Sequence, residues 1–245
     1  MSQRTTTIYD IKGLKKSYGD HLILNIRRLE IHRGTIYGMI GSIGSGKSTF
    51  LNILAGVTKQ TDGTVKFENE EFETNWLGKI KQNREIALAN FASISSGSTV
   101  SDIVKSIDKN RLEKHTSNYF QNGSLSVLLK RKLAALSPGE LSLLNMIIAL
   151  ESDPRVLMID DYGVFFDKNM ESDFRKKIVR MNKDLGTTIV LAAPSDQHIK
   201  RVASVLIYLD NGHISKIRPG VGRGSFNKDR KQSRRGGQRN YRKSS

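Results

Sequence analysis

A glycine-rich run is the part of the sequence whose residue types and spacing are best suited to chemistry. It reads Gly41-Ser-Ile-Gly-Ser-Gly-Lys-Ser-Thr49, and it separates a short apolar segment, residues 35–40, from a segment of helical pattern, residues 47–55. Glycines let consecutive backbone N–H groups turn inward around an anion, and the start of the following helix adds positive potential. The run therefore predicts a site for the phosphates of a nucleotide.

The spacing of this run, Gly-x4-Gly-Lys-Ser, is that of the Walker A motif. A flexible Gly–Ser linker would predict neither the preceding strand nor the Lys–Ser pair in register. We expect Lys47 to reach the β- and γ-phosphate oxygens and the Ser48 hydroxyl to bind Mg²⁺, so ATP and Mg²⁺ are the predicted ligands. The other nucleotide-binding residues predicted in the loop are Gly41, Ser42, Gly44, Ser45, Gly46 and Thr49.

A carboxylate at the end of a second apolar run is the candidate for completing the Mg²⁺ site. Residues 156–159 are Val-Leu-Met-Ile, and Asp160 follows them directly. An acid at the end of a buried strand can hold the coordination shell of the metal ion. Any apolar strand that ends in Asp would look the same, so the assignment of Asp160 depends on its spacing from other motifs.

The elements that must position these residues alternate between strands and helices. Strands are predicted at residues 8–14, 22–31, 35–40, 64–67, 85–89, 156–159, 188–193, 205–209 and 213–217. The runs at 156–159 and 188–193 are apolar throughout, as is typical of parallel strands covered on both faces. Residues 64–67 are predicted to form an edge strand after an Asp62-Gly63 turn, and Asn211-Gly212 indicates a hairpin. The pattern predicts an α/β core, a β-rich N-terminal layer and a helical insert at about residues 92–150.

From Ile8 to about Arg218 the chain resembles the ATP-binding domain of ABC proteins. Leu136-Ser-Pro-Gly-Glu140 stands where that family has its Leu-Ser-Gly-Gly-Gln signature, and Leu136 precedes Asp160 by the family's usual 24 positions. Asp167 matches the aspartate of the family's D-loop, and Tyr18 matches the aromatic residue that stacks on adenine. The resemblance implies an ABC-type P-loop NTPase with a RecA-like core, an antiparallel N-terminal layer and a helical subdomain.

The resemblance also implies how such domains assemble. They pair head to tail as a homodimer or heterodimer, so that the Walker A motif of one subunit and the signature of the other enclose each ATP. Ser137, Gly139 and Glu140 would then act in trans, with Ser137 and the Gly139 N–H facing the γ-phosphate of the partner's nucleotide. ATP binding would close the pair, and hydrolysis would reopen it.

Several positions depart from the family pattern. Pro138 replaces the first signature glycine and removes a backbone N–H, while Glu140 replaces glutamine and brings an acid close to a phosphate site. Asp161, the candidate catalytic carboxylate, is one methylene shorter than the family's glutamate, which leaves it about 1.5 Å farther from the water it would polarise. Tyr162 replaces the small residue or proline that usually follows. The signature Leu-Ser-Pro-Gly-Glu also resembles that of some soluble, translation-associated ABC proteins.

Two further family residues are missing. Asn90 and Phe91 stand where a glutamine normally senses Mg²⁺ and couples to a transmembrane partner, and Pro194 replaces the switch histidine. His198 lies one helical turn beyond Pro194 and is interpreted as a surface helix residue rather than a substitute. The binding residues are thus retained and the hydrolytic ones altered, which predicts a protein that binds MgATP and hydrolyses it slowly.

Composition and charge indicate the location of the protein and its division into domains. The chain has 245 residues, no cysteine and a formal net charge of +16, and half of that charge lies in residues 219–245, where nine Lys and Arg oppose Asp229. The absence of a signal-like or membrane-spanning apolar run predicts a cytoplasmic protein. We expect an ABC domain over residues 1–218, followed by a disordered basic tail at 219–245.

Two functions are compatible with these features. The first is the ATP-binding subunit of an ABC transporter, held at the inner face of the membrane by a transmembrane permease. The second is a non-transport ABC protein that acts on RNA, the ribosome or DNA through the basic tail. The first is preferred because it is the commoner role of a single domain of this length, whereas the tail and the missing glutamine favour the second.

Overall fold

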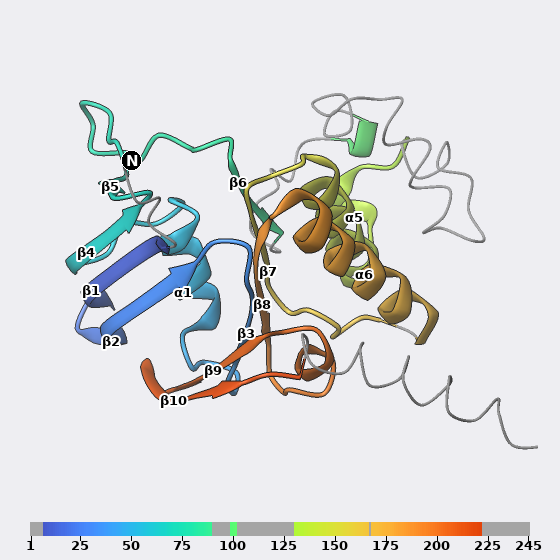
Figure 1. The fold of residues 1–245 in the computed structure, drawn as a ribbon. Helices are drawn as coiled ribbons and strands as arrows, with labels where there is room; N and C mark the ends of the chain where they lie inside the picture. The colour runs from blue at the N-terminus through green and yellow to red at the C-terminus, as the bar shows by residue number, and fades with distance from the viewer. Residues whose placement is uncertain (1–6, 90–98, 102–129, 167, 222–245) are drawn as a thin grey trace, which may run out of the picture.

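The computed structural model describes residues 7–89, 99–101, 130–166 and 168–221, which form two β-sheets and the helices that pack on them (Figure 1). Asn90, Phe91, Asp167 and residues 222–245 lie outside the described residues. What the sequence predicts for those positions therefore stays a prediction.

The first sheet is antiparallel and has the strand order β2-β1-β4-β5. Its strands are β1 (Thr7–Tyr18), β2 (His21–His32), β4 (Asp62–Phe67) and β5 (Glu70–Glu71). The prediction that residues 64–67 form an edge strand is wrong, because β5 pairs with β4 on its outer side. The chain reverses through Glu68 and Asn69, both with positive φ, as in the two-residue hairpin loops that glycine usually marks. No glycine occupies this turn, so the residue pattern did not indicate it.

The second sheet contains the predicted parallel strands and has the order β10-β9-β3-β8-β7-β6. The strands are β3 (Ile36–Ile40), β6 (Ile86–Ala89), β7 (Val156–Ile159), β8 (Thr188–Ala193), β9 (Val205–Asp210) and β10 (His213–Pro219). All neighbours pair in parallel except the β9–β10 hairpin, which is the one predicted around Asn211-Gly212. The expected α/β architecture with an antiparallel N-terminal layer is confirmed.

Helices cover one face of the second sheet, and α1 with the antiparallel sheet covers the other. The described helices are α1 (Lys47–Leu54), α5 (Pro138–Glu151), α6 (Lys168–Arg180), the single-turn 3₁₀ helices η1 (Leu133–Ala135) and η3 (Ile199–Arg201), and the π-helical turn η2 (Met181–Leu185) that continues α6. Figure 1 shows α5 and α6 side by side on the face away from β1 and β2. Of the helical insert predicted at about residues 92–150, the structure describes residues 99–101 and 130–150, which include η1 and most of α5.

Side chains of each central strand alternate between two hydrophobic clusters. In β7, Leu157 and Ile159 join the cluster formed with α5 and α6, whereas Val156 and Met158 join the one formed with α1 and the antiparallel sheet. Successive side chains of a strand point to opposite faces, so a sheet covered on both faces requires apolar residues at every position. This is why the central strands are apolar throughout, and why their ends, where polar residues begin, are well defined.

Candidate functional site

The predicted phosphate loop and Asp160 lie at the same edge of the central sheet. Ile40 of β3 pairs with Ala193 of β8, and Ile159 of β7 pairs with Leu191 of the same strand, so three parallel strands end close together. Ligands of open α/β sheets bind beyond the carboxyl ends of the strands. The loop that starts at Gly41, the acid at Asp160 and the segment that starts at Pro194 all begin at this edge.

Two glycines of the loop are required by its geometry. A Cβ atom at Gly41 would overlap the Leu209 carbonyl oxygen and lie 2.5 Å from Ser45 Oγ. Gly46 has a φ of +99°, and a Cβ there would lie 2.7 Å from Leu24 Cδ2. The loop is therefore packed between β2 and the β9–β10 hairpin, and α1 begins directly after it.

Lys47 is held inside this loop. Its Nζ donates to the carbonyl oxygens of Gly41 at 2.7 Å and Ser42 at 2.9 Å, and to Ser45 Oγ at 3.4 Å. Burial lowers the pKa of the Lys47 ammonium, and the nearby carboxylates of Asp160 and Asp161 oppose that shift. The loop thus positions a buried cation beside two acids.

Ser48 and Asp160 come together as the sequence predicts. Burial raises the pKa of the Asp160 carboxyl, and a hydrogen bond from the Ser48 side chain acts in the opposite direction. A hydroxyl and a carboxylate are the oxygen ligands that Mg²⁺ prefers. Partial burial disfavours the charged form of the Asp160 carboxyl, and a bound cation would favour it, so these residues fit the metal ion that accompanies a nucleotide. The described residues contain no cluster of three or more His, Asp or Glu that would hold a metal ion by itself.

Asp161, the candidate catalytic residue, has an unusual backbone. Its φ is +50°, its side chain is exposed, and its N–H donates to Asp160 Oδ1 at 3.1 Å. The next residue, Tyr162, donates its own N–H to the Ala192 carbonyl oxygen at 2.8 Å. A proline at 162 could not make that bond and would also force residue 161 into an extended conformation. With proline at 162, Asp161 would therefore have a different backbone conformation.

The Tyr162 ring is buried within the cluster formed with α5 and α6. It meets Phe166 edge-on with the ring centroids 5.2 Å apart, and Phe166 stacks in turn on Phe174. The buried hydroxyl has no hydrogen-bond partner among the described residues. Burial raises the pKa of this phenol well above its usual value, so the group stays neutral.

We predict that Tyr162→Phe stabilises the protein. Removing an unpartnered buried hydroxyl should raise the free energy of unfolding by about 1 kcal/mol, measured as a higher urea midpoint with an unchanged slope. Tyr9→Phe is a matched control, because the equally buried Tyr9 hydroxyl donates to the Leu54 carbonyl oxygen at 2.9 Å. That variant should be destabilised, and a shift of both variants in the same direction would contradict the prediction.

His198 lies closer to the site than a surface helix residue would. It is half-buried at the start of η3, and a Cβ built on Gly163 would lie only 2.8 Å from the imidazole Cδ2. The ring therefore packs against the backbone of the turn that follows Asp161. Pro194 is exposed at the end of β8.

The signature segment forms the start of α5. Ser137 is the N-cap residue: its Oγ accepts from the Glu140 N–H at 3.3 Å, while its own N–H donates to Glu140 Oε2 at 2.8 Å. The Ser137 hydroxyl also donates to the same carboxylate oxygen, at 2.9 Å. This reciprocal arrangement is a capping box, and Pro138 occupies the first helical position, where a missing N–H costs nothing. Pro138 and Glu140, which depart from the family signature, are therefore residue types that favour a capped helix start.

Arg131 is a residue of this region that the sequence interpretation missed. Its guanidinium forms a 2.9 Å ion pair with Glu140 Oε1. The pKa of the Glu140 carboxyl is lowered, first by the backbone and side-chain hydrogen bonds of Ser137 and then by Arg131. The Ser-x-x-Glu spacing could have predicted the box, but nothing in the spacing indicated the arginine.

The remaining predicted residues lie at the surface. Tyr18 is 50% exposed, and Lys16 Nζ lies 4.7 Å from its ring centroid. A Cβ on Gly139 would lie 3.8 Å from the side chain of Phe165, so the signature and the segment before Asp167 are in contact. Val164 and Phe165 are 48% and 43% exposed, which leaves an apolar rim next to the signature.

The fold and the site together define a P-loop nucleotide-binding protein. The profile of the family described as "ABC transporter" matches residues 24–162, which is more than half of the chain. The chain belongs to the ABC transporter family, and the matched region contains the phosphate loop and Asp160.

Known relatives agree with this assignment. The chain is 25% identical over 211 residues to the tungstate uptake system ATP-binding protein TupC of Peptoclostridium acidaminophilum, covering 84% of this chain and 96% of that protein. It is 27% identical over 221 residues to the methionine import ATP-binding protein MetN of Lactobacillus johnsonii, covering 84% of this chain but only 62% of the relative. MetN is thus considerably longer than the region that matches.

Solved structures show the same fold. An ATP-binding subunit of an ABC transporter superposes with a TM-score of 0.71 at 17% identity, over 94% of this chain and 95% of that one. A dimeric ATP-binding cassette in a post-hydrolysis state, bound to ADP and Pi, gives a TM-score of 0.69 at 19% identity, over 86% and 98% of the two chains. No helix among the described residues is long and apolar enough to cross a membrane.

Proposed function

We propose that the chain is the ATP-binding subunit of an ABC importer, that it binds MgATP between two cassettes, and that it hydrolyses ATP slowly. The observation that carries this proposal is the convergence of Lys47, Ser48 and Asp160 at the carboxyl edge of the central sheet. A buried ammonium, a hydroxyl and a partly buried carboxylate are the set needed to hold a nucleoside triphosphate with its metal ion.

Each residue of the loop has a separate role in this proposal. Bound MgATP would supply the phosphoanhydride bond that is broken. The protein would hold the phosphates in position and supply positive charge next to them. Lys47 would contact the β- and γ-phosphate oxygens, Ser48 and Asp160 would hold Mg²⁺, and the loop N–H groups would surround the phosphates. Tyr18, whose ring is half exposed, would stack on adenine.

Slow hydrolysis is supported by the geometry at Asp161. A general base must lie within hydrogen-bond reach of the water that it activates. The Asp161 side chain is one methylene shorter than glutamate and starts from a backbone with positive φ. Pro194 offers no side-chain donor to the γ-phosphate. ATP binding would therefore depend on residues that match the family pattern, whereas ATP hydrolysis would depend on positions that differ from it.

A dimer and a permease complete the proposed assembly. In a head-to-tail pair, Ser137 and Gly139 would face the nucleotide of the partner, and the exposed Val164 and Phe165 would lie at the interface. TupC and MetN are named as proteins of uptake and import systems, which favours a transmembrane partner that holds this chain at the membrane. The transported compound is not specified by any residue described.

The proposal is tested by measuring binding and turnover on the same preparation. We expect micromolar affinity for a fluorescent ATP analogue that is lost when Mg²⁺ is chelated, and a turnover below about 1 s⁻¹, the lower end of ordinary enzyme rates. Micromolar affinity together with turnover of about 10 s⁻¹ or more would exclude slow hydrolysis. For the assembly, the full chain should co-purify with a polytopic membrane protein from detergent extracts of the source membranes.

A further inference from the structure

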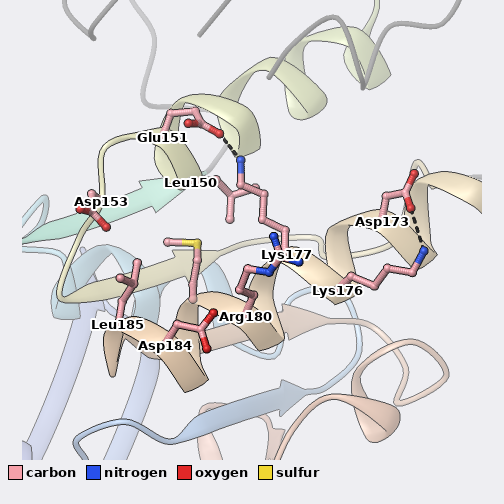
Figure 2. A pocket seen from close by; sticks show the side chains of 10 residues that line it. Leu150, Glu151, Asp153, Asp173, Lys176, Lys177, Arg180, Asp184 and Leu185 are labelled. Carbon is pink, nitrogen blue, oxygen red and sulfur yellow. Dashed lines mark hydrogen bonds and ion pairs between the residues drawn. The ribbon is translucent and has the colours of Figure 1, made fainter. Parts of the chain in front are cut away.

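The helix that carries the signature is anchored at its far end. Glu151 is the last residue of α5, and its side chain is only 3% exposed where it forms an ion pair with Lys177 of α6. The pair lies at a hollow of about 380 Å³ that both helices line (Figure 2). Removing either partner of a buried ion pair is costly, so α5 is firmly attached to α6 and presents the signature from a rigid base.

The near end of α5 carries an acid at a place that is unfavourable for a triphosphate. Glu140 Oε2 accepts from the Ser137 N–H at 2.8 Å and from the Ser137 hydroxyl at 2.9 Å. These hydrogen bonds lower the pKa of the Glu140 carboxyl, which is therefore ionised at neutral pH. In the proposed dimer, Ser137 faces the γ-phosphate of the partner's nucleotide. An uncompensated carboxylate here would repel that phosphate, and more strongly once closure excludes the screening water.

Arg131 supplies the compensating positive charge. Its Nη1 lies 2.9 Å from Glu140 Oε1, the carboxylate oxygen that Ser137 does not use. Nη2 donates to the Ala135 carbonyl oxygen, which holds the arginine against the segment that leads into the signature. Within the described part of the chain, no other cation forms an ion pair with Glu140. The two side chains are 38% and 36% exposed, so the pair adds little to the stability of a single chain.

We propose that Arg131 is the positioning residue that allows a signature containing glutamate to face a nucleoside triphosphate. Arg131 neutralises Glu140 and holds its carboxylate by Oε1, so the start of α5 brings no net negative charge to the partner's γ-phosphate. The arginine acts through Glu140 and does not need to touch the nucleotide. This inference rests on the proposed head-to-tail dimer, and it adds to that dimer a residue from outside the phosphate loop and the signature.

A purely structural role of Arg131 is the alternative. Its bond to the Ala135 carbonyl oxygen supports the segment before the signature, so losing the arginine would also loosen that segment. A second substitution separates the two roles. Glu140→Gln removes the negative charge and keeps the capping box, in which glutamine serves as well as glutamate. It should rescue an Arg131 variant only if the arginine acts by neutralising Glu140.

The test measures dimerisation of the full-length chain by sedimentation equilibrium, in low-salt buffer with Mg²⁺ and the non-hydrolysable ATP analogue AMP-PNP. Arg131→Ala should raise the dissociation constant of the dimer at least about tenfold, because each closed site then contains an unpaired carboxylate. Arg131→Lys keeps the charge without the guanidinium fork and should lose less. Arg131→Ala/Glu140→Gln should recover most of the wild-type affinity.

Arg155→Ala is the matched control. Arg155 is also partly exposed and forms ion pairs with Glu68 and Glu85, but it lies just before β7, at the opposite edge of the central sheet from Asp160. The control should dimerise as the wild type does. Raising the salt concentration should reduce the defect of Arg131→Ala, because salt screens the repulsion between like charges.

Three results would overturn the inference: wild-type dimerisation of Arg131→Ala, no recovery when Glu140→Gln is added, and an equal loss in Arg155→Ala. Thermal melts show whether each variant is folded, and Arg131→Lys with its Glu140→Gln double variant replaces Arg131→Ala if that protein is unfolded. A wild-type chain that binds the analogue but stays monomeric would also contradict the inference while leaving nucleotide binding intact. No binding of the analogue at all would instead contradict the proposed function.

Discussion

Replacing Asp161 by glutamate should raise the rate of ATP hydrolysis by about 100-fold while the affinity for MgATP stays the same. The added methylene moves the carboxylate about 1.5 Å towards the attacking water, and a misplacement of about 1 Å costs roughly that factor. Affinity should not change, because Lys47, Ser48 and Asp160 are untouched. Single-turnover hydrolysis and equilibrium binding, measured on the same protein, separate the two effects.

Two companion variants make the Asp161 result interpretable. Asp161→Asn keeps the size but removes the charge, so it should abolish the residual hydrolysis. Asp161→Glu/Tyr162→Pro also imposes an extended backbone at 161, at the cost of the hydrogen bond from the Tyr162 N–H to Ala192 and of the buried Tyr162 ring, so its folding must be checked by thermal melting. If neither glutamate variant hydrolyses ATP faster than the wild type, the length and direction of this side chain do not limit the reaction.

Lys47→Ala should weaken MgATP binding by about 100-fold or more. The ammonium is buried and hydrogen-bonded, and removing one member of such a charged contact costs roughly 2–5 kcal/mol in binding. Because Nζ also bonds to Gly41 and Ser42 within the loop, the variant loses a phosphate contact and part of the loop's own support. Isothermal titration with MgATP measures the loss.

The Lys47 experiment needs a control for general damage. Lys79→Ala removes an exposed lysine outside the loop and should bind MgATP as the wild type does. Thermal melting without nucleotide shows whether Lys47→Ala is folded. A folded Lys47→Ala protein with unchanged affinity would mean that the loop does not hold the phosphates.

The sequence predicted the central sheet and the phosphate site well, because both depend on strong local patterns. Apolar runs such as residues 156–159 are typical of strands covered on both faces, and the spacing around Lys47 indicates a tight loop. Turns were less visible: the reversal at Glu68 and Asn69 lacks the glycine that normally marks it. The β5 strand was missed for that reason.

Contacts between distant segments that share no recognisable motif could not be predicted. The signature departures at Pro138 and Glu140 suggested a weakened site, and only the structure shows them as parts of a helix cap paired with Arg131. In the same way, the charge count separated the tail from the domain but did not show that Arg180 and Arg201 line one hollow. These relationships depend on tertiary packing, which brings together residues far apart in the chain.

The cap at the start of α5 has a consequence for the closing of two cassettes. Ser137 already holds an anion, since its N–H and hydroxyl both donate to the Glu140 carboxylate. An N-cap of this kind is typically worth about 1 kcal/mol. A γ-phosphate arriving from the partner would therefore compete with a resident acid for the same donors. When the proposed dimer closes, the γ-phosphate would replace the Glu140 carboxylate as the acceptor of the hydrogen bonds that Ser137 donates. The equilibrium of closure would therefore depend on the difference between the free energies with which Ser137 binds these two anions.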